Sequence, residues 1–143
     1  MTIARHPFAA RPKSLAEAVA RANAGEPLSF RLDEFLDTFY GHIRDGDFDL
    51  AQAAIDEEPP PLHDKLAHAY IAAVAEHLAR RWRLRRIPAW TNGSSRFLEE
   101  PSFPFDDAGA KALYFVESPI AFRRRLIFIE ANPLRRATMA RIK

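Results

Sequence analysis

The chain has 143 residues, 48% of them hydrophobic and 28% charged, which supplies enough apolar material for one compact core. It has no cysteine, which excludes disulfides, thiolate zinc sites, iron–sulfur clusters and cysteine nucleophiles, and it has no run of about 18 apolar residues that would span a membrane. The formal net charge of +2 combines an acidic half, with 7 Lys and Arg against 13 Asp and Glu in residues 1–78, and a basic half, with 14 against 6 in residues 79–143. Because surfaces of one charge sign attract partners of the other, we expect a binding protein, and because the start of the chain lacks a signal-like apolar segment, we expect it in the cytoplasm.

The chain is expected to begin with a flexible arm over residues 1–13, which shows no periodicity. Residues 14–143 are expected to form one compact, mainly α domain. Ser14 and Glu17 have the spacing of a capping box, in which the hydroxyl and the carboxylate satisfy the first free amides of a helix. This pattern predicts a helix over residues 15–24.

Helical periodicity continues along the next segments of the chain. Apolar residues recur at i, i+3, i+4 and i+7 over residues 30–43, and a second short helix is expected over residues 48–55. Three consecutive prolines at 59–61 interrupt the pattern and predict a joint. The longest periodic segment, residues 63–83, predicts a central helix whose last turn is basic.

The C-terminal part has a mixed pattern. Residues 108–116 favour a helix, although the apolar stretch 113–116 would also suit a short strand. A Ser-Pro pair predicts a helical turn over residues 119–125. The apolar run 126–129 is compatible with a buried strand or with a helix, and a last short helix is expected from Asn132.

No catalytic, metal or cofactor site is predicted. His63, His68 and His77 are separated by five and nine residues, which places neighbours on opposite faces of a helix, whereas a zinc pair requires a spacing of four. The chain has no Gly-x-Ser-x-Gly elbow, no serine with a base at a recognisable spacing, and no glycine-rich phosphate loop among its 5 glycines. We therefore expect a protein that is not an enzyme.

Arginines and tryptophans are the candidate binding residues. Arginine outnumbers lysine 17 to 4, and its planar guanidinium suits bidentate contacts with phosphate or carboxylate. Two kinds of partner remain open: a nucleic acid, with tryptophan stacking on bases, or an acidic protein surface docked by Arg and aromatic anchors. Pairing with the acidic half of the chain itself is the structural alternative. The candidates are Arg80, Arg81, Trp82, Arg83, Arg85, Arg86, Trp90, Arg123, Arg124 and Arg125.

Four short segments carry a family resemblance. They are AYIAAVAEHLA at 69–79, PAW at 88–90, RFL at 96–98 and ESPIAFRRRLIFI at 117–129. Together they resemble small bacterial proteins that look like antitoxin partners of nucleotidyltransferase-type toxins, over roughly residues 66–137. In that pattern Asn is associated with the position of Leu126, so this chain departs from it there.

The resemblance implies a non-catalytic antitoxin that binds and neutralises a cognate nucleotidyltransferase-like toxin through protein–protein contacts. The alternative is a nucleic-acid-binding regulatory protein that uses its arginine-rich surface.

Overall fold

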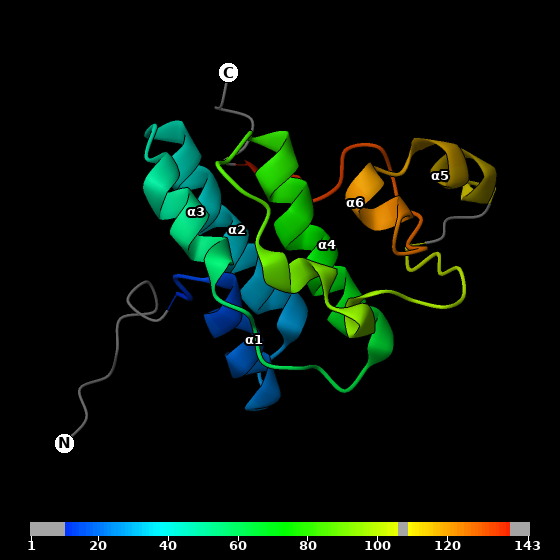
Figure 1. Ribbon diagram of the computed structural model, residues 1–143, viewed down its shortest axis with the longest axis horizontal. Helices are drawn as coiled ribbons and strands as arrows, with labels where there is room; N and C mark the ends of the chain where they lie inside the picture. Colours follow the sequence, from blue (N-terminus) through cyan, green and yellow to red (C-terminus); the bar gives the residue numbers. More distant parts are fainter. Residues whose placement is uncertain (1–10, 106–108, 138–143) are drawn as a thin grey trace. The chain divides into compact units, whose positions relative to one another are not determined.

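The computed structural model describes residues 11–105 and 109–137, and this part of the chain is mainly helical, as predicted (Figure 1). The chain divides into two compact units. Unit 1 is formed by residues 1–60 with 136–143, and unit 2 by residues 61–135. The boundary falls within the predicted proline joint, where proline cannot continue a helix.

Unit 1 is formed by three helices, α1 (Leu15–Asn23), α2 (Leu28–Arg44) and α3 (Phe48–Asp56), which pack against one another. Their bounds agree with the sequence prediction to within two residues at each end. Ser14 caps α1 by accepting a hydrogen bond from the Glu17 amide at 3.0 Å. The Glu17 carboxylate reaches one residue further back than in a standard capping box and accepts from the Lys13 amide at 2.9 Å.

The core of unit 1 comes from the periodic apolar positions of its helices. The predicted apolar face of α2 is buried, and fully buried side chains lie on α1, α2 and α3, among them Leu15, Val19, Phe35, Phe39 and Ile55. Burying this continuous face stabilises helices that would be marginal alone.

Unit 2 is built on the long helix α4 (Lys65–Arg81), which contacts α6 (Ile120–Arg123) and two short 3₁₀ helices, η2 (Ala89–Asn92) and η3 (Ser94–Arg96). Helix α4 is rich in alanine, which lets neighbouring backbone approach closely, and most of its residues from 68 to 79 are buried. The Asp64 carboxylate caps its start by accepting from the Ala67 amide at 3.0 Å.

The end of α4 has the hydrogen-bond pattern of a Schellman motif. The Leu84 amide donates to the Ala79 carbonyl at 2.9 Å, and the Arg83 amide donates to the Arg80 carbonyl at 3.3 Å. Arg83 adopts φ +53°, a left-handed conformation that this motif usually gives to glycine. An exposed arginine therefore occupies a mildly strained position immediately after the helix.

Two strand predictions in unit 2 are corrected. Residues 113–116 belong to helix α5 (Lys111–Glu117), because the amides of Tyr114 and Ser118 bond to carbonyls four residues earlier instead of to a neighbouring strand. Residues 126–129 form neither a helix nor a regular strand. Ile127 makes one isolated parallel bridge to Ser102, and the run is anchored mainly by burial of its side chains.

The ends of the chain leave two predictions partly untested. Most of the flexible arm expected over residues 1–13 lies outside the described residues. The last helix does not begin at Asn132, since residues 131–136 are irregular, and the chain beyond residue 137 is also outside the described part. Within residues 11–105 and 109–137, no helix is both long and apolar enough to cross a membrane.

Candidate interaction surface and pocket

Three arginines converge on one carboxylate in unit 2. Glu76, on the buried side of α4, accepts from Arg125 Nη1 at 2.7 Å through Oε1. Its second oxygen, Oε2, accepts from Arg80 Nε at 2.7 Å and from Arg124 Nη1 at 3.2 Å. Helices α4 and α6 are in contact, and this contact brings together residues almost 50 positions apart.

Arg125 is a structural residue, in contrast to its predicted place in an outward binding set. Its side chain is fully buried, and besides Glu76 it donates to the carbonyls of Ala121 at 2.7 Å and Thr91 at 2.6 Å. A buried guanidinium requires such partners because an unpaired buried charge is strongly unfavourable. The contacts tie α4, η2 and α6 together.

Arg80 and Arg124 lie at the edge of the same cluster and remain accessible, with side chains 42% and 35% exposed. Arg124 is held on several sides: Nη2 donates to Asn92 Oδ1 at 2.9 Å, and the guanidinium lies over the Phe97 ring at 5.1 Å from its centroid. Within the described residues, Arg80 bonds to Glu76 through Nε, and this bond does not use its two Nη groups.

The pKa values of Glu76 and Arg125 are both lowered, for different physical reasons. Burial alone would raise the pKa of Glu76, but hydrogen bonds from Arg125 and Arg80 outweigh it, so the pKa is lowered. The pKa of Arg125 is also lowered, chiefly by burial and further by repulsion from Arg124 and Arg80, against the attraction of Glu76. Glu76 is therefore charged at neutral pH and is outnumbered by cations.

The other predicted residues are distributed over unit 2. Arg81 and Arg83 are exposed at the end of α4, and the Arg81 guanidinium lies 4.1 Å from the centroid of the Trp82 ring. Arg85 and Arg86 are also exposed.

Two further predicted residues have local partners. Trp90 lies on η2 with one face under the buried Arg96, 4.9 Å from its guanidinium. Arg123 donates to the carbonyls of Val116 at 3.0 Å and Ser118 at 2.8 Å, where it satisfies groups at the C-terminal end of α5.

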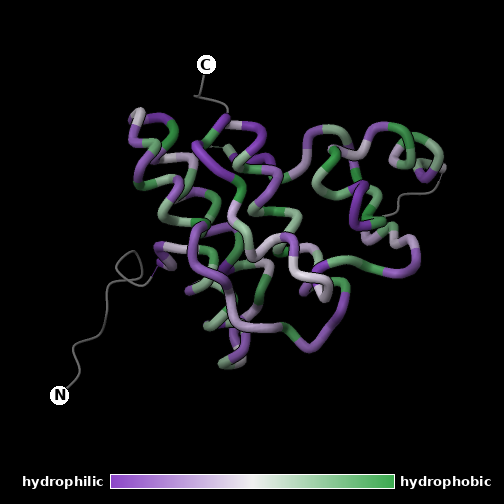
Figure 2. The backbone as a smooth tube through the Cα atoms, in the orientation of Figure 1, coloured by the Kyte–Doolittle hydropathy of each residue, from purple (hydrophilic) through white to green (hydrophobic). Residues whose placement is uncertain are grey.

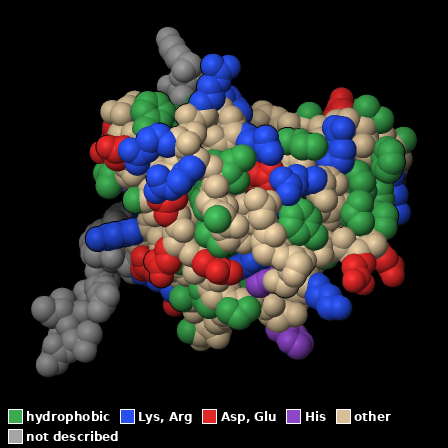
Figure 3. All heavy atoms as spheres, viewed as in Figure 1, with side chains coloured by type: hydrophobic (Ala, Val, Ile, Leu, Met, Phe, Trp, Pro, Cys, Tyr) green, Lys and Arg blue, Asp and Glu red, His purple; other side chains and the backbone are tan. Residues whose placement is uncertain are grey.

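Helix α5 and the start of α6 expose an apolar patch that was not predicted from the sequence. Figures 2 and 3 show hydrophobic residues along α5 and hydrophobic side chains gathered over it, next to Lys and Arg side chains. Tyr114 is the buried member of α5. The exposed side chains, here called the α5–α6 patch, are Leu113, Phe115, Val116 and Ile120.

The sequence does contain a signal for this patch. Four consecutive apolar residues, 113–116, distribute around all sides of a helix, so a seven-residue helix cannot bury them against one neighbour. Large apolar side chains exposed together indicate an interaction surface. Ile120 is three residues before Arg123 and four before Arg124, the helical residue that caps α6, so both arginines lie on the same side of this turn as Ile120.

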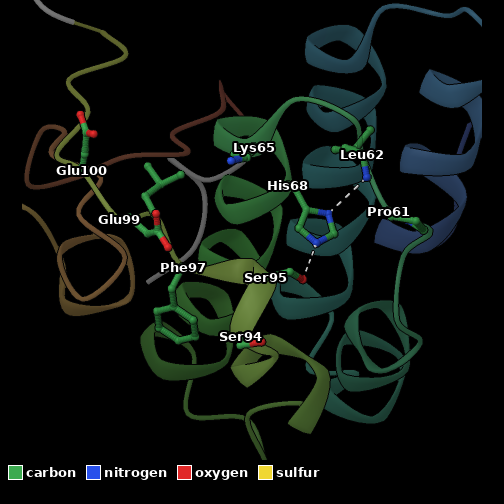
Figure 4. A pocket seen from close by; sticks show the side chains of 10 residues that line it. Pro61, Leu62, Lys65, His68, Ser94, Ser95, Phe97, Glu99 and Glu100 are labelled. Atoms are coloured by element: carbon green, nitrogen blue, oxygen red, sulfur yellow. Dashed lines mark hydrogen bonds between the residues drawn. The ribbon is translucent and has the colours of Figure 1, made fainter.

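Unit 2 also contains a half-open pocket of about 620 Å³ (Figure 4). His68 and Ser95 lie on one side, Phe97 and Glu99 lie on the other, and Lys65 also lines the pocket. His68 Nε2 is 3.0 Å from Ser95 Oγ, a serine–histidine pair that sequence spacing did not reveal because 27 residues separate the two.

The hydrogen bonds of His68 define its tautomer. Nδ1 is 3.2 Å from the Leu62 amide and 3.1 Å from Arg96 Nη1, and both of these groups can only donate. Nδ1 is therefore the acceptor, and the proton of the neutral ring is on Nε2, which donates to Ser95. A general base would instead accept the serine proton, so this pair has the wrong polarity for an activated nucleophile.

Within the described ranges, no group of three or more His, Cys, Asp or Glu side chains has the arrangement of a metal site. No protein-family model matches the chain, and no curated protein or solved structure has significant similarity to it.

Proposed function

We propose that the chain is a non-catalytic antitoxin that binds and neutralises a nucleotidyltransferase-like toxin, using the α5–α6 patch and the neighbouring arginines. The observation that supports binding to a protein is the patch: Leu113, Phe115, Val116 and Ile120 are about half exposed or more. Protein interfaces combine an apolar centre with arginine and a polar rim. The toxin as partner, and a cytoplasmic location, come from the family resemblance and the sequence composition.

The pocket supports a non-catalytic role in one respect. Its only serine–histidine pair among the described residues is oriented with the histidine donating, because Arg96 and the Leu62 amide occupy the other ring nitrogen. The residues that would be conspicuous in an enzyme site are thus used to fix η3 against α4.

The test is co-expression with the product of the adjacent gene, followed by affinity purification and an assay of nucleotidyl transfer by that product. We expect a complex and loss of the transferase activity. Leu113→Ser should weaken the complex at least tenfold, whereas Leu50→Ser, at a leucine of similar exposure on α3, should leave it unchanged. Absence of a complex, or equal effects of the two substitutions, would contradict the proposal.

A nucleic-acid-binding regulatory protein is the second candidate, supported by the exposed arginines that follow α4. Arg81, Arg83, Arg85 and Arg86 are all exposed within six residues of chain. Phosphate contacts release counterions, so binding to DNA or RNA would weaken steeply with salt and with charge reversal of Arg81 and Arg83. A gel shift with oligonucleotide pools that is insensitive to both would exclude this candidate.

A further inference from the structure

The cluster around Glu76 has more positive charge than it can neutralise internally. Arg125 and Glu76 are both fully buried and form one neutral pair. Arg80 and Arg124 share the remaining carboxylate oxygen, and across residues 11–105 and 109–137 no other carboxylate is within ion-pair distance of either. Three guanidinium groups therefore face a single negative charge.

The two accessible guanidinium groups are also close together. Arg80 Nε and Arg124 Nη1 are 2.7 and 3.2 Å from the same oxygen, so they are separated by no more than 5.9 Å. Arg80 Nε has a single N–H, which Glu76 already accepts, so an anion from solvent would be bound by the Nη groups of Arg80 and by the N–H groups of Arg124 that Glu76 and Asn92 do not use. The two guanidinium groups thus lie close enough to contribute N–H groups to one anion while they retain Glu76.

The site is preorganised as well. Arg124 is fixed by Glu76, by Asn92 and by the face of Phe97, and Arg80 is fixed through its Nε, so little side-chain freedom is lost when an anion binds. The Nη groups of Arg80, which Glu76 does not use, present the fork geometry that matches a carboxylate.

We propose that Arg80 and Arg124 form a receptor for one carboxylate of an acidic segment on the protein that this chain binds. The inference rests on the proposed function, because it assigns the anion to a protein partner. The neighbouring surface favours a protein over a nucleic acid: Ile120 is on the same side of α6 as Arg124, one turn earlier, and continues into the α5–α6 patch. Aliphatic side chains in such a patch pack against apolar protein side chains, whereas phosphate backbones require polar and cationic contacts.

The first experiment needs no partner and uses sodium acetate as the probe. Arginine Nε–Hε signals of the full chain are recorded by ¹⁵N NMR during an acetate titration, with chloride keeping the ionic strength constant. We expect saturable shifts for Arg80 and Arg124 that are at least threefold larger than the shift of Arg81, which is exposed on the same helix but lies beside Trp82. In the Arg124→Gln variant the Arg80 shift should fall to the Arg81 level. Equal shifts for all three arginines would overturn the proposal.

The second experiment distinguishes the source of the anion. A hexaglutamate peptide and hexathymidylate are titrated into the same protein, and we expect the peptide to bind at least tenfold more tightly and to lose that advantage in Arg80→Gln. Tighter binding of the oligonucleotide would overturn the assignment to a protein and favour the nucleic-acid candidate. Neither experiment contains the toxin. Failure of complex formation with the toxin would therefore refute the proposed function, whereas the acetate and peptide titrations test the receptor site independently.

Discussion

Replacing Glu76 with glutamine should test the central feature of unit 2, because Gln keeps the size of the side chain and removes its charge. Glu76 is fully buried and accepts hydrogen bonds from three arginines, one of which, Arg125, is fully buried as well. In Glu76→Gln the Arg125 guanidinium loses its counterion and keeps the carbonyls of Ala121 and Thr91 and the uncharged amide oxygen of glutamine as partners. Breaking a buried pair from one side costs about 3–5 kcal/mol, and the remaining carbonyl bonds place the expected loss near the lower limit, about 3 kcal/mol.

The loss is large relative to the total stability of a small domain, which is about 5–15 kcal/mol. Equilibrium unfolding in urea measures it, with the fluorescence of Trp82 and Trp90 as a signal from unit 2. For slopes of about 1–3 kcal/mol/M, the midpoint should fall by roughly 1–3 M. The matched control is Glu130→Gln, because Glu130 pairs with Arg135 at 3.3 Å where both side chains are more than half exposed. An exposed pair of this kind contributes about 0–1 kcal/mol.

If Glu76→Gln lost no more stability than Glu130→Gln, the buried Glu76–Arg125 pair would contribute no more to stability than an exposed ion pair does. A pH series provides a second check. Because the pKa of Glu76 is lowered below its ordinary value of 4.5, its contribution is fully present above pH 4.5 and is lost as the pH falls through the lowered pKa. The stability difference between the parent chain and Glu76→Gln should therefore be constant above pH 4.5 and shrink below it.

Three further measurements follow from the structure. Because φ of Arg83 is +53°, Arg83→Gly should raise the free energy of unfolding by about 0.5–1 kcal/mol, measured in urea. The control, Arg81→Gly inside α4, should lower it by about 1 kcal/mol. A loss of stability in Arg83→Gly would contradict the Schellman geometry. Long-range ¹⁵N NMR should find the neutral His68 ring protonated at Nε2, with Ser95 unreactive toward fluorophosphonates, and a proton on Nδ1 would reverse that assignment. Burial, and secondarily Arg81, lower the pKa of His77 from 6.5 to about 4. The free energy of unfolding should therefore fall as the pH drops from 6.5 to 4, and it should fall less steeply in His77→Gln. An NMR titration midpoint of His77 near 6.5 would refute this prediction.

Local signals predicted most helices of the chain. The capping residue Ser14 and the apolar spacing of α2 and α4 predicted helix bounds to within two residues, because hydrogen bonds and periodicity of this kind involve only neighbours along the chain. The strand predicted at residues 113–116 was wrong for a related reason. A short apolar run fits either structure, and the presence or absence of a pairing partner decides between them.

The candidate site was only partly predictable. Arg124 and Arg125 are neighbours in one basic segment, so the sequence treats them alike. In the structure Arg125 is buried and paired, whereas Arg124 is accessible. The sequence around Glu76 did not lead to a prediction of its role. A carboxylate within an alanine-rich apolar stretch nevertheless indicates a buried partner elsewhere in the chain. That partner is almost 50 residues away.

The sequence by itself determined the helical class, the joint at the three prolines and the basic character of residues 79–143, since these depend on backbone preferences and on formal charge. Only the tertiary structure decided which arginines are available for binding, because availability depends on the packing of α6 against α4 and on the one carboxylate that this contact encloses. The tertiary structure also decided that Leu113, Phe115 and Val116 of α5 are exposed. Whether a side chain is exposed depends on which other residues pack around it in the folded chain, and the order of residue types along the sequence does not specify that packing.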